Sequence, residues 1–191
     1  MALINVAARE IHCKIVYYGP GMGGKTSNLQ YIHTQVPKDA KGDLLSIATE
    51  TERTLFFDFL PLDLGTVHGF RTRFHLYTVP GQVLYDRTRL AVLNGADGIV
   101  FVADSQAEKF EENVQSIGEL EMNMRRIGKD LGHFPFVIQW NKRDMPSALP
   151  VSVLERYLNR RQVPTFEAIA SNGKGVFATL RTISKNVMAQ L

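Results

Sequence analysis

The chain has 191 residues, 45% of them hydrophobic and 21% charged, which predicts one soluble globular domain over residues 1–191 and excludes a disordered chain. Its 22 basic and 19 acidic residues are scattered, which argues against nucleic acid as a partner, and one cysteine excludes an intramolecular disulfide framework. With no leader, bilayer-spanning run or lipid-anchor motif recognisable, we expect a cytoplasmic protein without a lipid anchor.

Short apolar runs alternate with longer amphipathic segments along most of the chain. Nearly continuous apolar runs are typical of strands buried on both faces of a parallel sheet, and apolar residues at helical spacing predict helices that cover it. Strands followed by helices imply right-handed crossovers and a three-layer α/β fold. The expected strands are 11–18, 97–103, 135–140 and 164–169, and the expected helices are 25–35, 110–127 and 177–191.

The region from 37 to 79 departs from this alternation. Residues 54–60 and 70–79 both resemble strands, and residues 63–66 are expected to join them in a half-exposed hairpin. Residues 37–53 show neither period and are expected to form a long functional loop. The prediction is a six-stranded, mostly parallel sheet with one antiparallel edge strand and about five helices, to which residues 3–6 can add a short strand.

A glycine-rich motif follows the first strand and opens the first helix. Glycines let backbone N–H groups turn around phosphate oxygens, and the helix N-terminus adds partial positive charge. Lys25 is expected to reach the outer phosphates, the Thr26 hydroxyl to bind Mg²⁺ and Ser27 to contact the nucleotide. The motif reads Gly19-Pro20-Gly21-Met22-Gly23-Gly24-Lys25-Thr26.

A second motif, Asn141-Lys142-Arg143-Asp144, ends the apolar run 135–140, where open α/β sheets bind ligands. The Asp144 carboxylate can accept two hydrogen bonds at once, which matches the adjacent N1–H and 2-amino donors of guanine. Asn141 is expected to bond the opposite edge of the base and to brace the phosphate loop. The two motifs together favour GTP over ATP and disfavour an ATP-using kinase.

With both motifs 116 residues apart in an α/β chain, the sequence resembles a Ras-like small GTPase over nearly its whole length, most closely the bacterial MglA group. The resemblance implies a GTP-hydrolysing switch in cell polarity and motility. It also implies GTP and GDP as ligands, Mg²⁺ as cofactor, a GTPase-activating roadblock-domain (MglB-like) homodimer and nucleotide-dependent effectors.

The resemblance also implies roles for residues outside the two motifs. Thr54 matches the loop threonine that completes Mg²⁺ coordination, Gly81 the second-switch amide at the γ-phosphate, and Gln82 the residue that orients the attacking water. A looser match to the motif that backs the guanine lies after the last strand and comprises Ala170, Ser171 and Asn172.

One position departs from the family pattern. The second-switch motif normally begins with an aspartate that holds a metal-bound water, and here that position is Thr78. Asp58 is a candidate replacement, because it lies on the same strand face as Thr54. Since four residues of strand cover about 13 Å, Asp58 is expected to reach the metal only if the hairpin bends or slides. The alternative is an ordinary hairpin carboxylate.

Arg53 precedes Thr54 in the loop expected to close over the phosphates. One interpretation is an arginine finger supplied in cis, and the other is a solvated charge paired with Glu50 or Glu52.

A second hypothesis for the whole chain is a guanine-nucleotide-binding scaffold that does not hydrolyse GTP. Thr78 favours that hypothesis and Gln82 opposes it. Gly21 is expected to lie tightly against the γ-phosphate.

Overall fold

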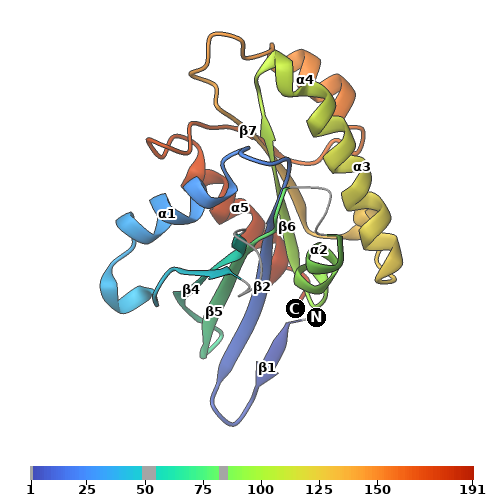
Figure 1. Cartoon of the computed structure of the whole chain (residues 1–191). Helices are drawn as coiled ribbons and strands as arrows, with labels where there is room; N and C mark the ends of the chain where they lie inside the picture. The colour runs from blue at the N-terminus through green and yellow to red at the C-terminus, as the bar shows by residue number, and fades with distance from the viewer. Residues whose placement is uncertain (1, 49–54, 82–85) are drawn as a thin grey trace.

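A computed structural model describes residues 2–48, 55–81 and 86–191. The fold is an α/β sandwich whose central sheet has the strand order β3-β4-β5-β2-β6-β7-β8 (Figure 1). In addition, β1 pairs with the N-terminal part of β2. The strands are β1 Leu3–Asn5, β2 Glu10–Tyr18, β3 Leu45–Ala48, β4 Leu55–Val67, β5 Phe70–Thr78, β6 Gly98–Asp104, β7 Phe136–Asn141 and β8 Thr165–Glu167. The helices are α1 Lys25–Gln35, α2 Asp86–Leu93, α3 Phe110–Arg126, α4 Val151–Leu158 and α5 Val176–Met188.

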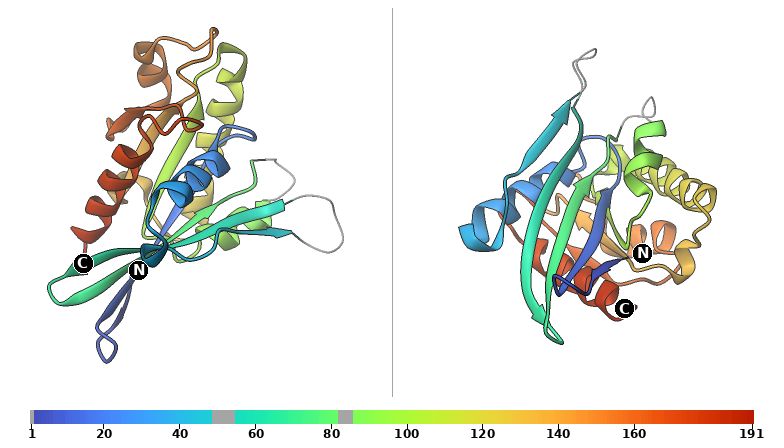
Figure 2. Two further views of the ribbon diagram at one scale, coloured as in Figure 1. Left: turned by 90° about the vertical axis from the view of Figure 1, so that its left-hand side faces the viewer. Right: turned by 90° about the horizontal axis from the view of Figure 1, so that it is seen from below.

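The helices cover the two faces of the sheet in separate groups, as Figures 1 and 2 show. Leu29 of α1 and Ile183 of α5 pack in one core with the inward side chains of β2 and β5. Leu93 of α2, Leu120 of α3 and Leu154 of α4 pack in a second core on the opposite face. The sequence prediction of a three-layer α/β fold is therefore confirmed.

The buried strands match their sequence pattern. All seven residues of β6 and all six of β7 are buried, and both strands run parallel to their neighbours. In β5, by contrast, burial alternates: Thr72, Phe74 and Leu76 are buried, while Arg73 and His75 are only half-buried. The predicted half-exposed strand is thus correct.

The hairpin is longer than its sequence suggested. β4 continues through the expected turn at 63–66 and ends at Val67, so the chain reverses at His68 and Gly69. Asp63 and Gly65, which read as turn residues, instead form an irregularity in the pairing with β5, where the Asp63 carboxylate accepts a bond from the Gly65 N–H. The prediction of a turn at 63–66 is wrong because the same residues suit a bulge.

Two short strands raise the count from six to eight. β3 lies inside the segment expected to be a loop and pairs antiparallel with β4, and β1 pairs antiparallel with β2. β1, β3 and β4 all have antiparallel partners, so the prediction of one antiparallel edge strand is also wrong. The short strand expected at residues 3–6 is confirmed as β1, whereas β3 was not predicted, because a strand of four residues carries no readable period. Within the described residues, no helix has the length and apolar character to cross a bilayer.

Candidate nucleotide-binding site

The glycine-rich motif forms a loop between the carboxyl end of β2 and the start of α1. Gly24, which precedes the first residue of α1, has a φ of 103°, and a Cβ there would lie 2.1 Å from the Asn141 side-chain nitrogen. Gly19 likewise approaches the backbone of β6, where a Cβ would lie 2.2 Å from the Val102 carbonyl oxygen. Side chains are excluded at both positions, so the loop can follow the strand ends closely.

Lys25 is buried inside this loop. Its ammonium group donates hydrogen bonds to the carbonyl oxygens of Gly19 (2.9 Å) and Pro20 (2.6 Å). The pKa of Lys25 is lowered to about 8, mainly by burial and also by the positive charge of Arg89, while the negative charge of Asp58 opposes the shift. A buried ammonium group bonded only to backbone carbonyls in the described residues is suited to bind phosphate oxygens.

A cavity of about 230 Å³ lies beside the loop and brings the two sequence motifs together. The Asp144 side chain is exposed at this cavity and has no partner among the described residues, so both carboxylate oxygens are available to a ligand. The lining residues are Met22, Gly24, Ser27, Asn141, Lys142, Asp144, Met145, Ile169, Ala170 and Ser171.

Asn141 links three parts of the chain. Its side-chain nitrogen donates to the Gly23 carbonyl oxygen (2.9 Å), and its side-chain oxygen accepts from the Ala170 N–H (2.9 Å). The loop after β8 is therefore tied to the phosphate loop through the end of β7. Of the three residues expected there, Ala170 and Ser171 line the cavity, whereas the Asn172 side chain accepts from the Lys174 N–H in an exposed turn.

Sequence reasoning missed three residues at this end of the site. Met145 and Ile169 line the cavity. Asp104, fully buried at the end of β6, pairs with the Lys142 ammonium at 2.7 Å. Asp104 could have been found, because a carboxylate that ends a buried parallel strand lies at the edge where such sheets bind ligands.

Asp58 lies against the other end of the phosphate loop and is 4% exposed. Its Oδ2 accepts hydrogen bonds from the hydroxyls of Thr26 (2.6 Å) and Thr78 (2.9 Å), and its Oδ1 accepts from the Ser46 hydroxyl (2.7 Å). The Thr78 hydroxyl oxygen also accepts from the Asp58 N–H (2.8 Å). The observed register already brings Asp58 to Thr26, so this contact needs no further bending or sliding of the hairpin; the role of Asp58 at a metal stays a prediction.

Gly81 lies close against the phosphate loop. A Cβ at Gly81 would lie 2.2 Å from the Gly21 nitrogen and 2.6 Å from the Pro20 carbonyl carbon. Only glycine allows this contact, which brings Gly81 against Gly21. Arg53, Thr54 and Gln82 lie outside the described residues, so their expected roles stay predictions.

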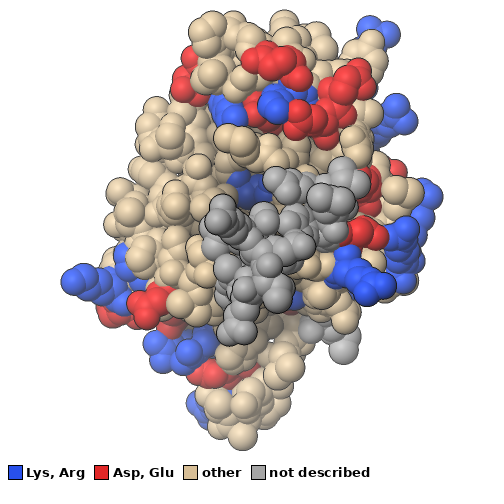
Figure 3. All heavy atoms as spheres, in the orientation of Figure 1, with Lys and Arg blue, Asp and Glu red and all other residues tan. Residues whose placement is uncertain are grey.

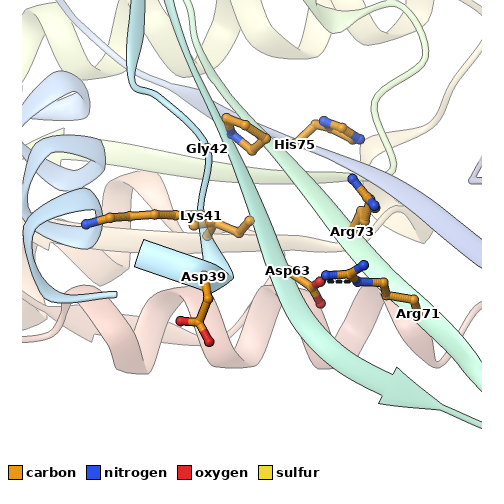
Figure 4. A pocket seen from close by; sticks show the side chains of 9 residues that line it. Asp39, Lys41, Gly42, Asp63, Arg71, Arg73 and His75 are labelled. Atoms are coloured by element: carbon orange, nitrogen blue, oxygen red, sulfur yellow. Dashed lines mark hydrogen bonds and ion pairs between the residues drawn. The ribbon is translucent and has the colours of Figure 1, made fainter. Parts of the chain in front are cut away.

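A second cavity, of about 220 Å³, lies at the sheet edge around β4 and β5 (Figure 4). Its basic groups already have partners: Arg71 pairs with Asp63, and Arg73 pairs with Glu10. Figure 4 shows the Lys41 side chain extending away from this group. Acidic and basic side chains are also intermixed on the face in Figure 3, whose described residues form no continuous basic area. These features favour the cavity at Asp144 as the nucleotide site.

Comparison with known proteins identifies the family. The chain is 55% identical over its full length to the mutual gliding-motility protein MglA of Myxococcus xanthus, of which it covers 98%. This chain belongs to the MglA family of Ras-like small GTPases. It is also 26% identical, over 94% of its length, to the Ras-related protein RABG3c of Arabidopsis thaliana, and 25% identical, over 95%, to the Rab7 GTPase of Neurospora crassa; it covers 84% and 85% of these two proteins. No family model matches the chain.

Membership of the MglA family confirms the predicted GTPase activity, because small GTPases hydrolyse GTP, and it implies that the chain binds GTP and GDP. The hypothesis of a non-hydrolysing scaffold rested on Thr78. The Thr78 hydroxyl donates a hydrogen bond to Asp58, so a carboxylate does lie beside the position where the family pattern has an aspartate, although this carboxylate comes from β4.

Proposed function

We propose that this MglA-family GTPase is a Mg²⁺-dependent switch that hydrolyses GTP and regulates cell polarity and gliding motility from the cytoplasm. The MglA family assignment supports the process, and the contact between Gly81 and the phosphate loop supports the switch. A γ-phosphate bound beside Gly21 would reorganise this contact, and hydrolysis would restore it, so that the two nucleotide states offer different surfaces to partners.

The observation that carries the proposal is the cavity that joins Asp144 and Asn141 to the phosphate loop. Asp144 is proposed to bind the N1–H and 2-amino groups of guanine, and Asn141 to contact its opposite edge. The loop from Gly19 to Thr26, with Ser27, is proposed to bind the phosphates through backbone N–H groups and Lys25. Lys142, Ala170 and Ser171 complete the base pocket.

The residues around Thr26 fit a magnesium ion. Thr26 and Asp58 offer hydroxyl and carboxylate oxygens 2.6 Å apart, and Mg²⁺ prefers oxygen ligands. Thr26 and Asp58 would hold the ion, with Thr54 as a third ligand proposed from the family pattern. Bound Mg²⁺ would neutralise charge on the β- and γ-phosphates. Gln82 is proposed to orient the attacking water, and Arg53 to stabilise the charge that develops on the transferred phosphoryl group.

The proposed activating partner is a roadblock-domain (MglB-like) homodimer, and effectors are proposed to bind the GTP state. Phosphate release under single-turnover conditions tests the reaction, with GTP or ATP and with Mg²⁺ or a chelator. We expect slow release from GTP alone, faster release with the roadblock dimer, and none from ATP or without Mg²⁺. Equal release from ATP would contradict the assignment of Asp144.

A further inference from the structure

Three buried polar side chains connect the phosphate loop to the C-terminal helix. Asn28 lies on α1, Gln139 on β7 and Thr179 on α5, and none of the three side chains is exposed. Helices α1 and α5 cover the same face of the sheet (Figure 1), where the surrounding core is apolar. Polar groups in such a core are costly unless every donor and acceptor has a partner.

The hydrogen bonds among these side chains satisfy that condition and determine which group donates and which accepts at each step. Thr179 donates its hydroxyl proton to the Gly175 carbonyl (2.7 Å), so it offers only an acceptor to the Gln139 side-chain nitrogen (3.0 Å). Gln139 and Asn28 then form a reciprocal amide pair, with bonds of 2.8 and 3.0 Å. The second N–H of the Asn28 amide donates to the Gly24 carbonyl oxygen (2.9 Å). The orientation of each group determines that of the next.

The carbonyl of Gly24 belongs to the peptide unit that begins α1. Because a trans peptide is planar, fixing the Gly24 C=O also directs the Lys25 N–H the opposite way, toward the phosphate loop. The preceding peptide unit is held in the same manner, since Asn141 donates to the Gly23 carbonyl. Side-chain amides anchored on β7 therefore orient two successive peptide units of the loop, one directly and one through Asn28.

We propose that Asn28, Gln139 and Thr179 form a positioning relay that sets how long the protein retains a bound guanine nucleotide. The relay holds the Lys25 N–H in its phosphate-binding direction from α5, which packs beside α1 on the same face of β7. Losing the bond to Gly24 lets that peptide unit rotate more freely, so GDP dissociates faster. This inference rests on the proposed binding of nucleotide by the phosphate loop.

Two variants separate positioning from stability. Asn28→Leu combined with Gln139→Met replaces both partners of the amide pair by apolar groups of similar shape, which costs little stability. Thr179 keeps its bond to Gly175, and the Gly24 carbonyl keeps the helical bond from the Asn28 N–H (3.1 Å). Gln139→Met alone leaves the buried Asn28 amide short of partners but retains its bond to Gly24.

The experiment measures release of a fluorescent GDP analogue and the thermal unfolding midpoint of the nucleotide-free protein. We expect the double variant to unfold near the wild-type midpoint yet release GDP about fivefold faster, as the loss of one hydrogen bond predicts. Gln139→Met alone should unfold at lower temperature with a smaller change in release. Release rates that follow the unfolding midpoints would show a structural role only and would overturn the relay.

Two further variants keep the test decisive if the double variant does not fold. Thr179→Val removes the acceptor for Gln139 and should speed release, whereas Thr179→Ser keeps the hydroxyl and should restore the wild-type rate. Asn159→Leu, a buried amide at the end of α4 bonded to Glu155 and Val163, is the control that should leave release unchanged. Equal rates in Thr179→Val and wild type would contradict the relay. Failure of wild-type protein to bind GDP would instead contradict the proposed function.

Discussion

The guanine end of the candidate site and its phosphate end, here the part around Thr26 and Asp58, take their carboxylates from different parts of the sheet, although Asn141 of β7 also contacts the phosphate loop. At the guanine end, Asn141 and Asp104 end fully buried parallel strands, and their bonds go to backbone groups or to Lys142. At the phosphate end, Asp58 comes from β4, whose outer neighbour β3 has four residues. One end is therefore fixed by the core, and the other depends on the register of an antiparallel hairpin near the sheet edge.

This difference predicts which functions are separable. Substitutions at the guanine end should alter which base is bound, and should do so in both nucleotide states. Substitutions at the phosphate end should alter Mg²⁺ use and hydrolysis while base selection persists. Four measurements test this division.

Asp144→Asn should have the largest effect. An asparagine cannot accept both donors of guanine, so we expect affinity for GDP to fall by about 100-fold or more. Xanthosine diphosphate, which has a carbonyl in place of the 2-amino group, should then bind better than GDP. Calorimetric titration of both ligands checks this. Asp130→Asn, an exposed carboxylate bonded to Gly132 and His133, is the matched control and should bind GDP normally.

Gly21→Val should block the reaction without blocking binding. A Cβ at Gly21 would meet the Gly81 carbonyl carbon at 3.9 Å, so the free protein has room for a side chain, and we expect the methyl groups of valine to hinder the second switch from taking its GTP-bound position. We expect single-turnover hydrolysis to slow by about 100-fold, with GTP affinity nearly unchanged. Gly118→Ala, at a glycine of α3 with open space around it, should react as the wild type does. Normal turnover by Gly21→Val would contradict the placement of the γ-phosphate.

Asp58→Asn tests the phosphate end. Removing the negative charge beside Thr26 should weaken Mg²⁺-dependent GTP binding by about tenfold at low Mg²⁺, while the preference for guanine over adenine stays intact. Asp63→Asn changes a carboxylate on the opposite face of the same strand, bonded to Arg71, and serves as the control. An unchanged Mg²⁺ requirement in Asp58→Asn would remove Asp58 from the metal site.

Lys25 should give the site a modest dependence on pH. Its pKa of about 8 lies below the ordinary 10.5, so the folded free protein binds fewer protons than the unfolded chain between these values, and its free energy of unfolding rises with pH there. Phosphates favour the charged ammonium. GDP affinity should therefore fall about threefold from pH 7.5 to 8.5, with proton uptake on binding. Calorimetry in two buffers of different ionisation enthalpy measures both, and a pH-independent affinity would contradict the shift.

The comparison between the two ends also explains what could be predicted from the sequence. The contiguous motifs at Gly19–Thr26 and Asn141–Asp144 follow buried strands, so their position at one sheet edge follows from the fold class alone. The contact of Asp58 with Thr26 could not be predicted, because it depends on pairing Ser46 with Asp58 and Phe59 with Tyr77. An antiparallel register of this kind is not readable from a single strand pattern.

The relay through Asn28, Gln139 and Thr179 could not be predicted from the sequence either. Gln139 interrupts an apolar strand, but Asn28 lies among other polar residues of α1, and Thr179 lies in a helix more than a hundred residues further along the chain. A lone polar residue in an apolar pattern indicates a partner without identifying it. Only the packing of α1 and α5 on the same face of β7 brings the three side chains together.

The central claim is that Asp144 selects the purine of a nucleotide whose phosphates occupy the loop from Gly19 to Thr26. The most direct measurement is calorimetric titration of nucleotide-stripped, folded protein with GTP and with ATP in the presence of Mg²⁺. We expect tight binding of GTP and no measurable binding of ATP at the same concentration. Equal affinity for the two, or binding of neither, would contradict the account.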